Sequence, residues 1–136
     1  MRLVLCCGVF DLFHLAHLRH LQEARAMGDY LVVAVTTDAG VGKPGRPITP
    51  QDERLEIVQA VRWVSAAALC ANSLDALAKW KPQIYAKGAD YLAGARKGLL
   101  KEEIAFCIKH GIQIAHTRPN PQTTTKIIGR IKCASC

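Results

Sequence analysis

The chain has 136 residues, half of them hydrophobic, and Lys plus Arg outnumber Asp plus Glu by 18 to 11. This length suits one domain with a single core, and the composition excludes an intrinsically disordered chain. No apolar run approaches the roughly 20 residues that span a bilayer. The net charge of +7 favours anionic partners. Because aromatic residues make up only 6% and the basic residues form no long block, we expect small phosphorylated ligands and no nucleic acid.

The two ends of the chain carry weak signals. The first residues, MRLVLCC, are too short for a secretory signal and lack a small-residue cleavage site, so we expect a cytoplasmic protein that does not bind membranes. A C-x-x-C pair, Cys133 and Cys136, closes the chain. One such pair is a weak zinc signal, and free thiols on a frayed tail over 132–136 are the expectation.

Strand-like and helix-like segments alternate along the chain. Gly28 is a plausible end for the first helix, and Thr49 with Pro50 a plausible start for the second. The Gly- and Pro-rich run 38–48 between them is expected to be a loop. Strands are expected over 2–7, 30–37, 66–71, 83–88 and 112–117. Helices are expected over 17–27, from Pro50 to about Val61, from Asn72 or Ser73 to about Lys81, near 97–110 and from about Thr123 to Lys132.

This alternation predicts an α/β fold, a Rossmann-like three-layer sandwich with about five parallel strands in a single domain over 1–136. In such sheets, ligands bind beyond the carboxyl ends of the strands. The segments 8–16, 38–48, 87–96 and 118–124 each follow an expected strand. We therefore expect these four loops to converge on one site.

Three histidines, each three residues apart, follow the first strand in the stretch GVFDLFHLAHLRHL. Its first part, GVFDLFHLAH, resembles the G-x-F-D-x-x-H-x-G-H signature of the cytidylyltransferase-like nucleotidyltransferases. The segments GDYLVVAVTTD, GRPITPQDER and QTTTKI resemble later elements of that family and occur in the same order. The resemblance covers Arg2 to about Ile131. It implies transfer of a nucleotidyl group from a nucleoside triphosphate to a small phosphorylated acceptor, with Mg²⁺ accompanying the triphosphate, and a homodimer.

The chemistry of the histidine stretch agrees with that reaction. An anionic phosphate must approach the α-phosphorus of a triphosphate, so the site needs fixed donors around that group. His14 and His17 can supply N–H donors beside a helix N-terminus. Without the surrounding motifs, both would be read as packed or solvated side chains. A zinc site built from three histidines is the weaker alternative, and His20, which no motif includes, is expected at the surface.

The family resemblance implies a role for individual residues. His14 and His17 contact the triphosphate, Asp11 lies by the reacting centre near Mg²⁺, and Arg62 stabilises the transition state. Either Lys43 or Arg46 holds phosphates, and Asp90 faces the base or ribose. The remaining implied nucleotide or phosphate contacts are Gly8, Val9, Phe10, Lys87, Arg118, Thr123, Thr124 and Thr125.

The sequence departs from the family pattern at Ala16, where the signature has glycine, at Ser65, where an aspartate is common, and at Pro119. The segment KGADY resembles the branch that transfers adenylyl groups to heptose phosphates, whereas the spacing of Arg118 to TTTKI resembles glycerol-3-phosphate cytidylyltransferase. Transfer from ATP to a sugar phosphate is the favoured hypothesis. Transfer from CTP to glycerol 3-phosphate or a related alcohol phosphate is the alternative. A catalytically silent nucleotide-binding module is the third, motivated by Ala16 and Pro119.

Overall fold

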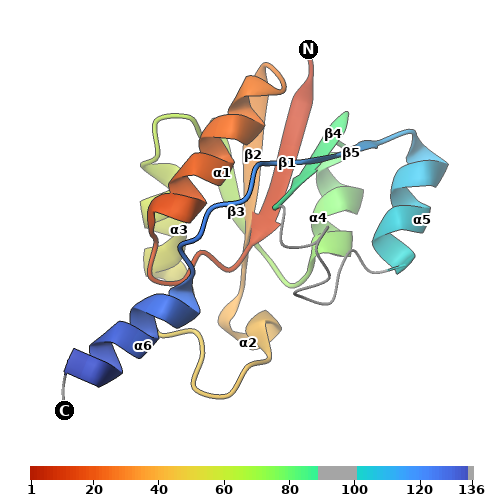
Figure 1. Cartoon of the computed structure of the whole chain (residues 1–136). Coiled ribbons are helices and arrows are strands. Elements are labelled where there is room, and N and C mark those ends of the chain that lie inside the picture. Colours follow the sequence, from red (N-terminus) through yellow and green to blue (C-terminus); the bar gives the residue numbers. More distant parts are fainter. Residues whose placement is uncertain (89–100, 135–136) are drawn as a thin grey trace.

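A parallel sheet of five strands, in the order β3-β2-β1-β4-β5, forms the centre of the molecule (Figure 1). The computed structural model describes residues 1–88 and 101–134. The strands are β1 (Leu3–Gly8), β2 (Tyr30–Thr36), β3 (Ala66–Cys70), β4 (Ile84–Lys87) and β5 (Gln113–His116). The central strand β1 pairs with both β2 and β4, and Leu5 lies in register with Val32 and Tyr85. From β1 the chain adds β2 and β3 on one side of the sheet and then β4 and β5 on the other. At this change of side, a crevice is expected between β1 and β4 at the carboxyl edge.

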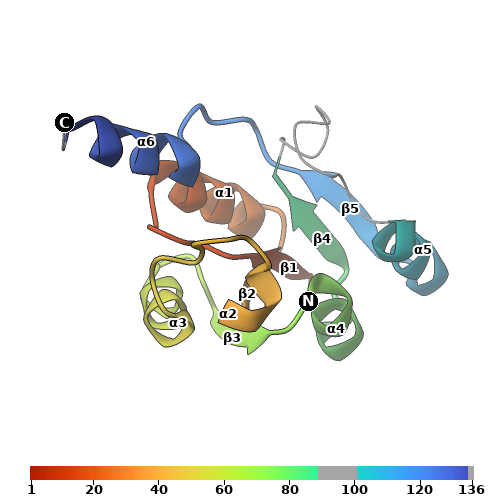
Figure 2. The ribbon, with the colours of Figure 1, turned by 90° about the horizontal axis from the view of Figure 1, so that it is seen from below.

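Helices cover both faces of the sheet, which gives three layers (Figure 2). Helices α1 (Leu15–Ala26) and α3 (Gln51–Gln59) pack on one face, and α4 (Ser73–Trp80) and α5 (Lys101–His110) on the other. Val33 faces the first pair and Val32 the second, as the alternation of a strand requires. The predicted Rossmann-like three-layer fold with parallel strands is therefore confirmed.

Several element boundaries differ from the sequence prediction. Helix α1 begins at Leu15, two residues early, because His14 provides its N-cap. The expected loop after β2 contains a short helix, α2 (Asp38–Val41), which Thr37 caps. Pro50, not Thr49, occupies the N-cap of α3. Helix α6 (Thr124–Ala134) continues through part of the segment that was expected to fray, and residues 135–136 lie outside the described part.

The carboxyl edge of the sheet gathers the loops that follow β1 and β2, the segment that follows β5, and helices α2 and α6 (Figure 1). Helix α6 projects from this edge beyond the body of the molecule. Among the described residues, no helix has both the length and the apolar character that crossing a bilayer demands.

Candidate active site

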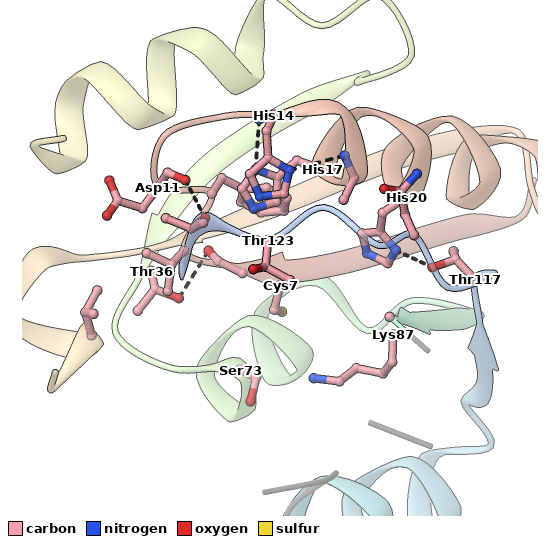
Figure 3. Close-up of a pocket in the computed structure, with 18 of the residues that line it drawn as sticks. Cys7, Asp11, His14, His17, His20, Thr36, Ser73, Lys87, Thr117 and Thr123 are labelled. Atoms are coloured by element: carbon pink, nitrogen blue, oxygen red, sulfur yellow. Dashed lines mark hydrogen bonds between the residues drawn. The ribbon is translucent and has the colours of Figure 1, made fainter. Parts of the chain in front are cut away.

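A cavity of about 390 Å³ opens at the carboxyl edge, between the N-termini of α1, α4 and α6 (Figure 3). The predicted convergence of loops is thus observed for the segments that the structure describes. The predicted site residues that line this cavity are Gly8, Val9, Phe10, Asp11, His14, His17, Lys43, Arg46, Lys87, Arg118, Thr123 and Thr124.

His14 and His17 form a stacked pair whose ring centroids lie 3.8 Å apart. Nδ1 of His14 accepts a hydrogen bond from the amide of Ala16 at 3.2 Å, and Nδ1 of His17 accepts one from the amide of His14 at 3.3 Å. Burial lowers the pKa of His14, which keeps its ring neutral at pH 7. A neutral imidazole that accepts at Nδ1 carries its proton on Nε2. The backbone of α1 therefore selects, for both rings when neutral, the tautomer that donates from Nε2.

The loop that leads into this pair is held in an unusual backbone conformation. Phe10 (φ 56°) and Leu12 (φ 48°) are non-glycine residues in the left-handed region, where a side chain costs free energy. In return, Phe10 is buried and its ring centroid lies 5.3 Å from that of His17, while the ring of Phe13 lies at 5.4 Å. The strained loop thus packs an aromatic wall against the second histidine and fixes its position.

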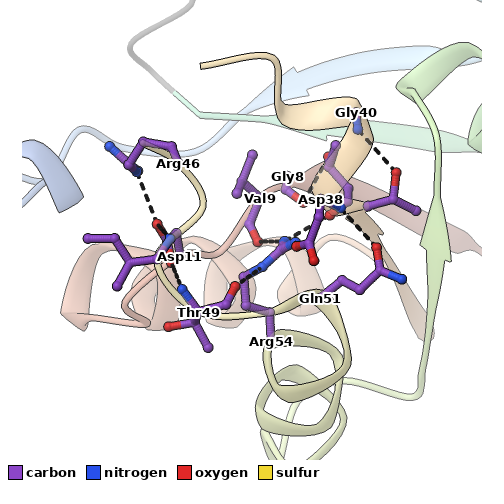
Figure 4. Close-up of polar contacts among 12 residues, drawn as sticks. Gly8, Val9, Asp11, Asp38, Gly40, Arg46, Thr49, Gln51 and Arg54 are labelled. Atoms are coloured by element: carbon purple, nitrogen blue, oxygen red, sulfur yellow. Dashed lines mark hydrogen bonds and ion pairs between the residues drawn. The ribbon is translucent and has the colours of Figure 1, made fainter. Parts of the chain in front are cut away.

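Asp11 lines the cavity but serves the loop that follows β2 (Figure 4). Its Oδ1 accepts from the amide of Thr49 at 2.9 Å, and its Oδ2 accepts from the amide of Ile48 at 2.9 Å and from Nε of Arg46 at 3.0 Å. Burial alone would raise the pKa of this carboxyl, but these three donors outweigh it and hold the pKa below its usual value. Both carboxylate oxygens accept from protein donors and the side chain is 1% exposed. Asp11 therefore lies at the cavity as predicted, and its predicted role near Mg²⁺ stays a prediction.

Arg54 holds together the backbone segments that frame the cavity, and the sequence patterns did not indicate it. It is 1% exposed and donates to three backbone carbonyls, those of Val9, Thr36 and Thr49, at 2.7 to 2.8 Å (Figure 4). Its guanidinium also pairs with Asp38 at 2.7 Å. Arg54 therefore ties together the ends of β1 and β2 and the start of α3. Its position four residues before the core residue Val58 on α3 was the available signal, because residues at that spacing share a helix face.

Basic and hydroxyl side chains border the histidine pair on the side of β2 and α6. Lys43 and Arg46 both line the cavity, and Arg46 is the one paired with Asp11. Thr123 caps α6 by accepting from the amide of Lys126 at 3.1 Å, and the Thr124 hydroxyl donates to the Asp11 carbonyl at 2.9 Å. Thr125 does not join them: it is exposed and borders a separate groove between α6 and 44–48.

A buried polar network reaches the cavity floor at the end of β4. Nζ of Lys87 lies 3.2 Å from the Tyr85 hydroxyl and 3.9 Å from the carboxylate of Glu103 on α5. Glu103 also accepts from Tyr85 at 2.7 Å and from the hydroxyl of Ser73, the first residue of α4. Lys87 is 6% exposed and Glu103 is 3% exposed. Tyr85 and Glu103, on the face of the sheet that α4 and α5 cover, thus fix the ammonium of Lys87, which lines the cavity.

His20 is not the surface histidine that the sequence suggested. It is half-buried, it lines the cavity, and its Nδ1 lies 2.7 Å from Oγ1 of Thr117 at the end of β5 (Figure 3). Burial, and next the charge of Lys87, lower the pKa of His20 to about 4, while Glu23 acts in the opposite direction. The three histidines therefore lie in one cavity. Among the residues that the structure describes, no group of three or more His, Cys, Asp or Glu side chains is arranged to hold a metal ion.

Three predicted site residues remain: Arg62 lies away from the cavity, Arg118 lines it but pairs with Glu23, and Asp90 lies outside the described residues. Arg62 follows α3 at the amino edge of the sheet, where its guanidinium lies 5.9 Å from the ring centroid of Trp63, so within one chain it does not reach the cavity. Arg118 lines the cavity, but its Nε and its amide both donate to Glu23 on α1. Asp90 lies outside the described residues.

Comparison with known proteins places this cavity in a family context. The family model described as cytidylyltransferase-like matches residues 5–130. The chain belongs to the cytidylyltransferase-like family. It is 41% identical over 91 residues to ethanolamine-phosphate cytidylyltransferase of Mus musculus, which covers 64% of this chain and 22% of that protein. It is 43% identical over 103 residues to the bifunctional protein HldE of Streptomyces coelicolor, with 70% and 22% coverage. The chain thus spans about a fifth of these relatives.

Solved structures share the fold. A lipopolysaccharide core biosynthesis protein from Thermoplasma volcanium superposes with a TM-score of 0.71 at 29% identity, covering 90% of this chain and 99% of that one. Pantothenate synthetase from Thermus thermophilus superposes with a TM-score of 0.59 at 11% identity, covering 88% and 55%, a likeness of fold alone.

Proposed function

We propose that this chain is a nucleotidyltransferase, which moves the nucleotidyl group of a nucleoside triphosphate to the phosphate of a small acceptor and releases pyrophosphate. The observation that carries the proposal is the stacked pair of His14 and His17, in which both Nδ1 atoms accept from the backbone of α1. Membership of the cytidylyltransferase-like family supports it, as does the similarity to the ethanolamine-phosphate cytidylyltransferase of Mus musculus.

In the proposed reaction, an oxygen of the acceptor phosphate forms a bond to the α-phosphorus, and the bond from that phosphorus to the oxygen of the leaving pyrophosphate breaks. A phosphate monoester is already anionic near neutral pH, so no side chain has to remove a proton. The task is to offset negative charge on the α-phosphoryl oxygens, and His14 and His17 donate to that charge from Nε2. The amides at the start of α6, behind Thr123, and the side chain of Lys43 hold the β- and γ-phosphates.

Mg²⁺ enters this proposal as part of the nucleoside triphosphate. The ion prefers one or two carboxylates together with substrate phosphates. Asp11 has both carboxylate oxygens occupied by protein donors. The chain's own residues therefore favour Mg²⁺ that arrives on the phosphates, where it neutralises charge, over an ion that is resident beforehand.

ATP with a sugar phosphate is the favoured substrate pair, and CTP with glycerol 3-phosphate or a related alcohol phosphate is the alternative. The test is a thermal-shift screen of ATP, CTP, GTP and UTP with Mg²⁺, followed by pyrophosphate release with a sugar 1-phosphate, glycerol 3-phosphate and phosphoethanolamine. A ligand at 100 times its Kd stabilises the folded chain by about 2.7 kcal/mol, which such a screen detects. Turnover with CTP alone selects the alternative, and nucleotide binding without pyrophosphate release from any acceptor selects the silent module.

The predicted homodimer is part of the same proposal. Sedimentation at micromolar concentration measures it, and a strictly monomeric mass contradicts it.

A further inference from the structure

His20 stands one helical turn beyond His17 on α1, and both line the cavity. Residues three apart share a helix face and are separated by about 4.5 Å along the axis. Nδ1 of His20 is 2.7 Å from Oγ1 of Thr117, and the amide of Thr117 donates to the carbonyl of Lys87 at 2.9 Å. The ring is therefore anchored to the ends of β4 and β5. With Nδ1 committed to Thr117, Nε2 is the nitrogen available to a ligand.

The charge state of His20 narrows the kind of ligand. Burial and the ammonium of Lys87 on β4 lower its pKa to about 4, and the carboxylate of Glu23 on α1 does not reverse this. The ring is thus neutral at physiological pH. With Nδ1 committed to Thr117, Nε2 of the neutral ring is a donor in one tautomer and an acceptor in the other. A hydroxyl group can pair with Nε2 in either tautomer, whereas an anionic phosphate oxygen can pair with it only when Nε2 carries the proton.

The two flanks of the cavity, one beside β2 and the other beside β4 and β5, differ in the balance of charged side chains. On the β2 side, the residues that line the cavity include two basic side chains, Lys43 and Arg46, and one carboxylate, that of Asp11, which pairs with Arg46. On the β4 and β5 side, the charge of Lys87 is matched by Glu103 at 3.9 Å. Phosphates favour the more basic flank. The uncharged part of a nucleotide favours the β4 and β5 flank, because His20 and Thr117 offer neutral hydrogen-bonding groups there and Glu103 offsets the charge of Lys87.

Covalent structure then indicates which uncharged part reaches His20. In a nucleoside triphosphate the ribose is joined directly to the α-phosphate, whereas the base is one group farther away. If His17 donates to the α-phosphate, a group one helical turn along α1 lies at the distance of the sugar. On the basis of the proposed function, we propose that His20 binds a ribose hydroxyl of the nucleoside triphosphate through Nε2, and that Thr117 is its positioning residue.

Matched substitutions test the roles of Nδ1 and Nε2 of His20 separately. His20→Asn keeps a polar atom near the place of Nδ1 and lacks Nε2, whereas His20→Gln keeps a polar atom near the place of Nε2. Thr117→Val removes the anchoring hydroxyl, and Thr117→Ser keeps it. His110→Asn, on the exposed end of α5, is the control. Calorimetry with Mg²⁺ measures Kd for the nucleotide that the parent binds best, for its 2′-deoxy and 3′-deoxy forms, and for inorganic tripolyphosphate.

We expect the parent to bind one deoxy form about threefold to tenfold more weakly than the ribonucleotide, the cost of one hydrogen bond. His20→Asn should bind both forms with the same, weaker affinity, while its affinity for tripolyphosphate is unchanged. His20→Gln and Thr117→Ser should keep part of the discrimination, Thr117→Val should lose most of it, and His110→Asn should match the parent.

Three results would overturn the inference: a parent that binds all three nucleotides equally, a His20→Asn variant that discriminates as the parent does, or a parallel loss of tripolyphosphate affinity. If His20→Asn instead raises only the KM for the acceptor, His20 belongs to the acceptor site and the inference is wrong. These outcomes are judged on a parent that releases pyrophosphate. A parent that binds no nucleotide contradicts the proposed function itself.

Discussion

The guanidinium of Arg46 meets the carboxylate of Asp11 at 3.0 Å, although 35 residues separate them in sequence. Together with the amides of Ile48 and Thr49, this contact folds the loop that carries Lys43 back over the cavity. The aspartate of the family signature therefore positions the loop that lines the cavity on the side proposed to hold phosphates.

Replacing Asp11 by asparagine should loosen that loop. The amide keeps one acceptor oxygen but loses the charge that pairs with Arg46, so we expect a loss of about 2 kcal/mol in unfolding free energy at pH 7 and a higher KM for the nucleotide. Because folding lowers the pKa of Asp11, its ionised form stabilises the fold above the usual value of 3.8, and this contribution is lost as pH falls through the folded pKa. Urea unfolding at pH 7 and pH 3 measures the loss of stability and its pH dependence, and steady-state kinetics measure the KM. Equal stability of the variant, the parent and the exposed control Glu56→Gln at pH 7 contradicts the prediction.

His17 combines a helix cap with a proposed catalytic donor, and two substitutions separate these roles. His17→Asn keeps an acceptor for the amide of His14 and removes the Nε2 donor. We expect it to fold like the parent with kcat lower by about 10²–10³, since a donor to the transition state is lost. His17→Gln should retain more activity but lose about 1 kcal/mol of stability with the cap. Steady-state kinetics and thermal unfolding give the comparison, and normal turnover by His17→Asn would falsify the catalytic role.

The sheet was predictable from sequence because local patterns determine it. Strand β2 reads as a continuous apolar run since both of its faces are covered, and Val32 and Val33 indeed face opposite layers. The site was predictable only where a motif is local. His14 and His17 support each other within one helical turn, but the partners of Asp11 and His20 lie 35 to 38 and 97 residues away. No periodicity reports a hydrogen bond over such a separation.

Arg54 should be among the residues most important for stability. Arg54→Met keeps the apolar stem but leaves the carbonyls of Val9, Thr36 and Thr49 without their donor. Each unsatisfied buried group costs about 1–3 kcal/mol, so we expect a loss of at least 3 kcal/mol in unfolding free energy. Arg54→Lys should recover little, because an ammonium lacks the planar fork of donors. Denaturant titration measures this beside Arg19→Met, an exposed control on α1, and losses of similar size in the two would refute the assignment.

The segment from Arg118 to Lys126 should change its contacts when nucleotide binds. The Arg118 side chain is 87% exposed and pairs with Glu23, yet its segment lines the cavity beside the histidine pair. A bound triphosphate offers Arg118 more negative charge than one carboxylate, so we expect it to leave Glu23 and the segment to gain protection from hydrogen exchange. Glu23→Gln should raise nucleotide affinity by removing the competing pair. Equal exchange of residues 118–126 with and without nucleotide would sink this prediction.

His20 should make the stability of the fold depend on pH between 6.5 and about 4. Its pKa in the folded chain is about 4, against a usual value of 6.5, because of burial and Lys87, with Glu23 acting in opposition. As pH falls through this window, the unfolded chain takes up a proton that the folded chain refuses, so folding loses stability. The full difference corresponds to about 3 kcal/mol, present above pH 6.5 and gone near pH 4. Urea unfolding from pH 7 to pH 4 should therefore show a descending limb in the parent that is clearly shallower in His20→Gln, where only the smaller contribution of His14 remains, and intact in His110→Gln. Lys87→Met should make the limb shallower, because it removes the charge that opposes protonation. Parallel curves for the parent and His20→Gln would mean that His20 is not buried as the structure places it.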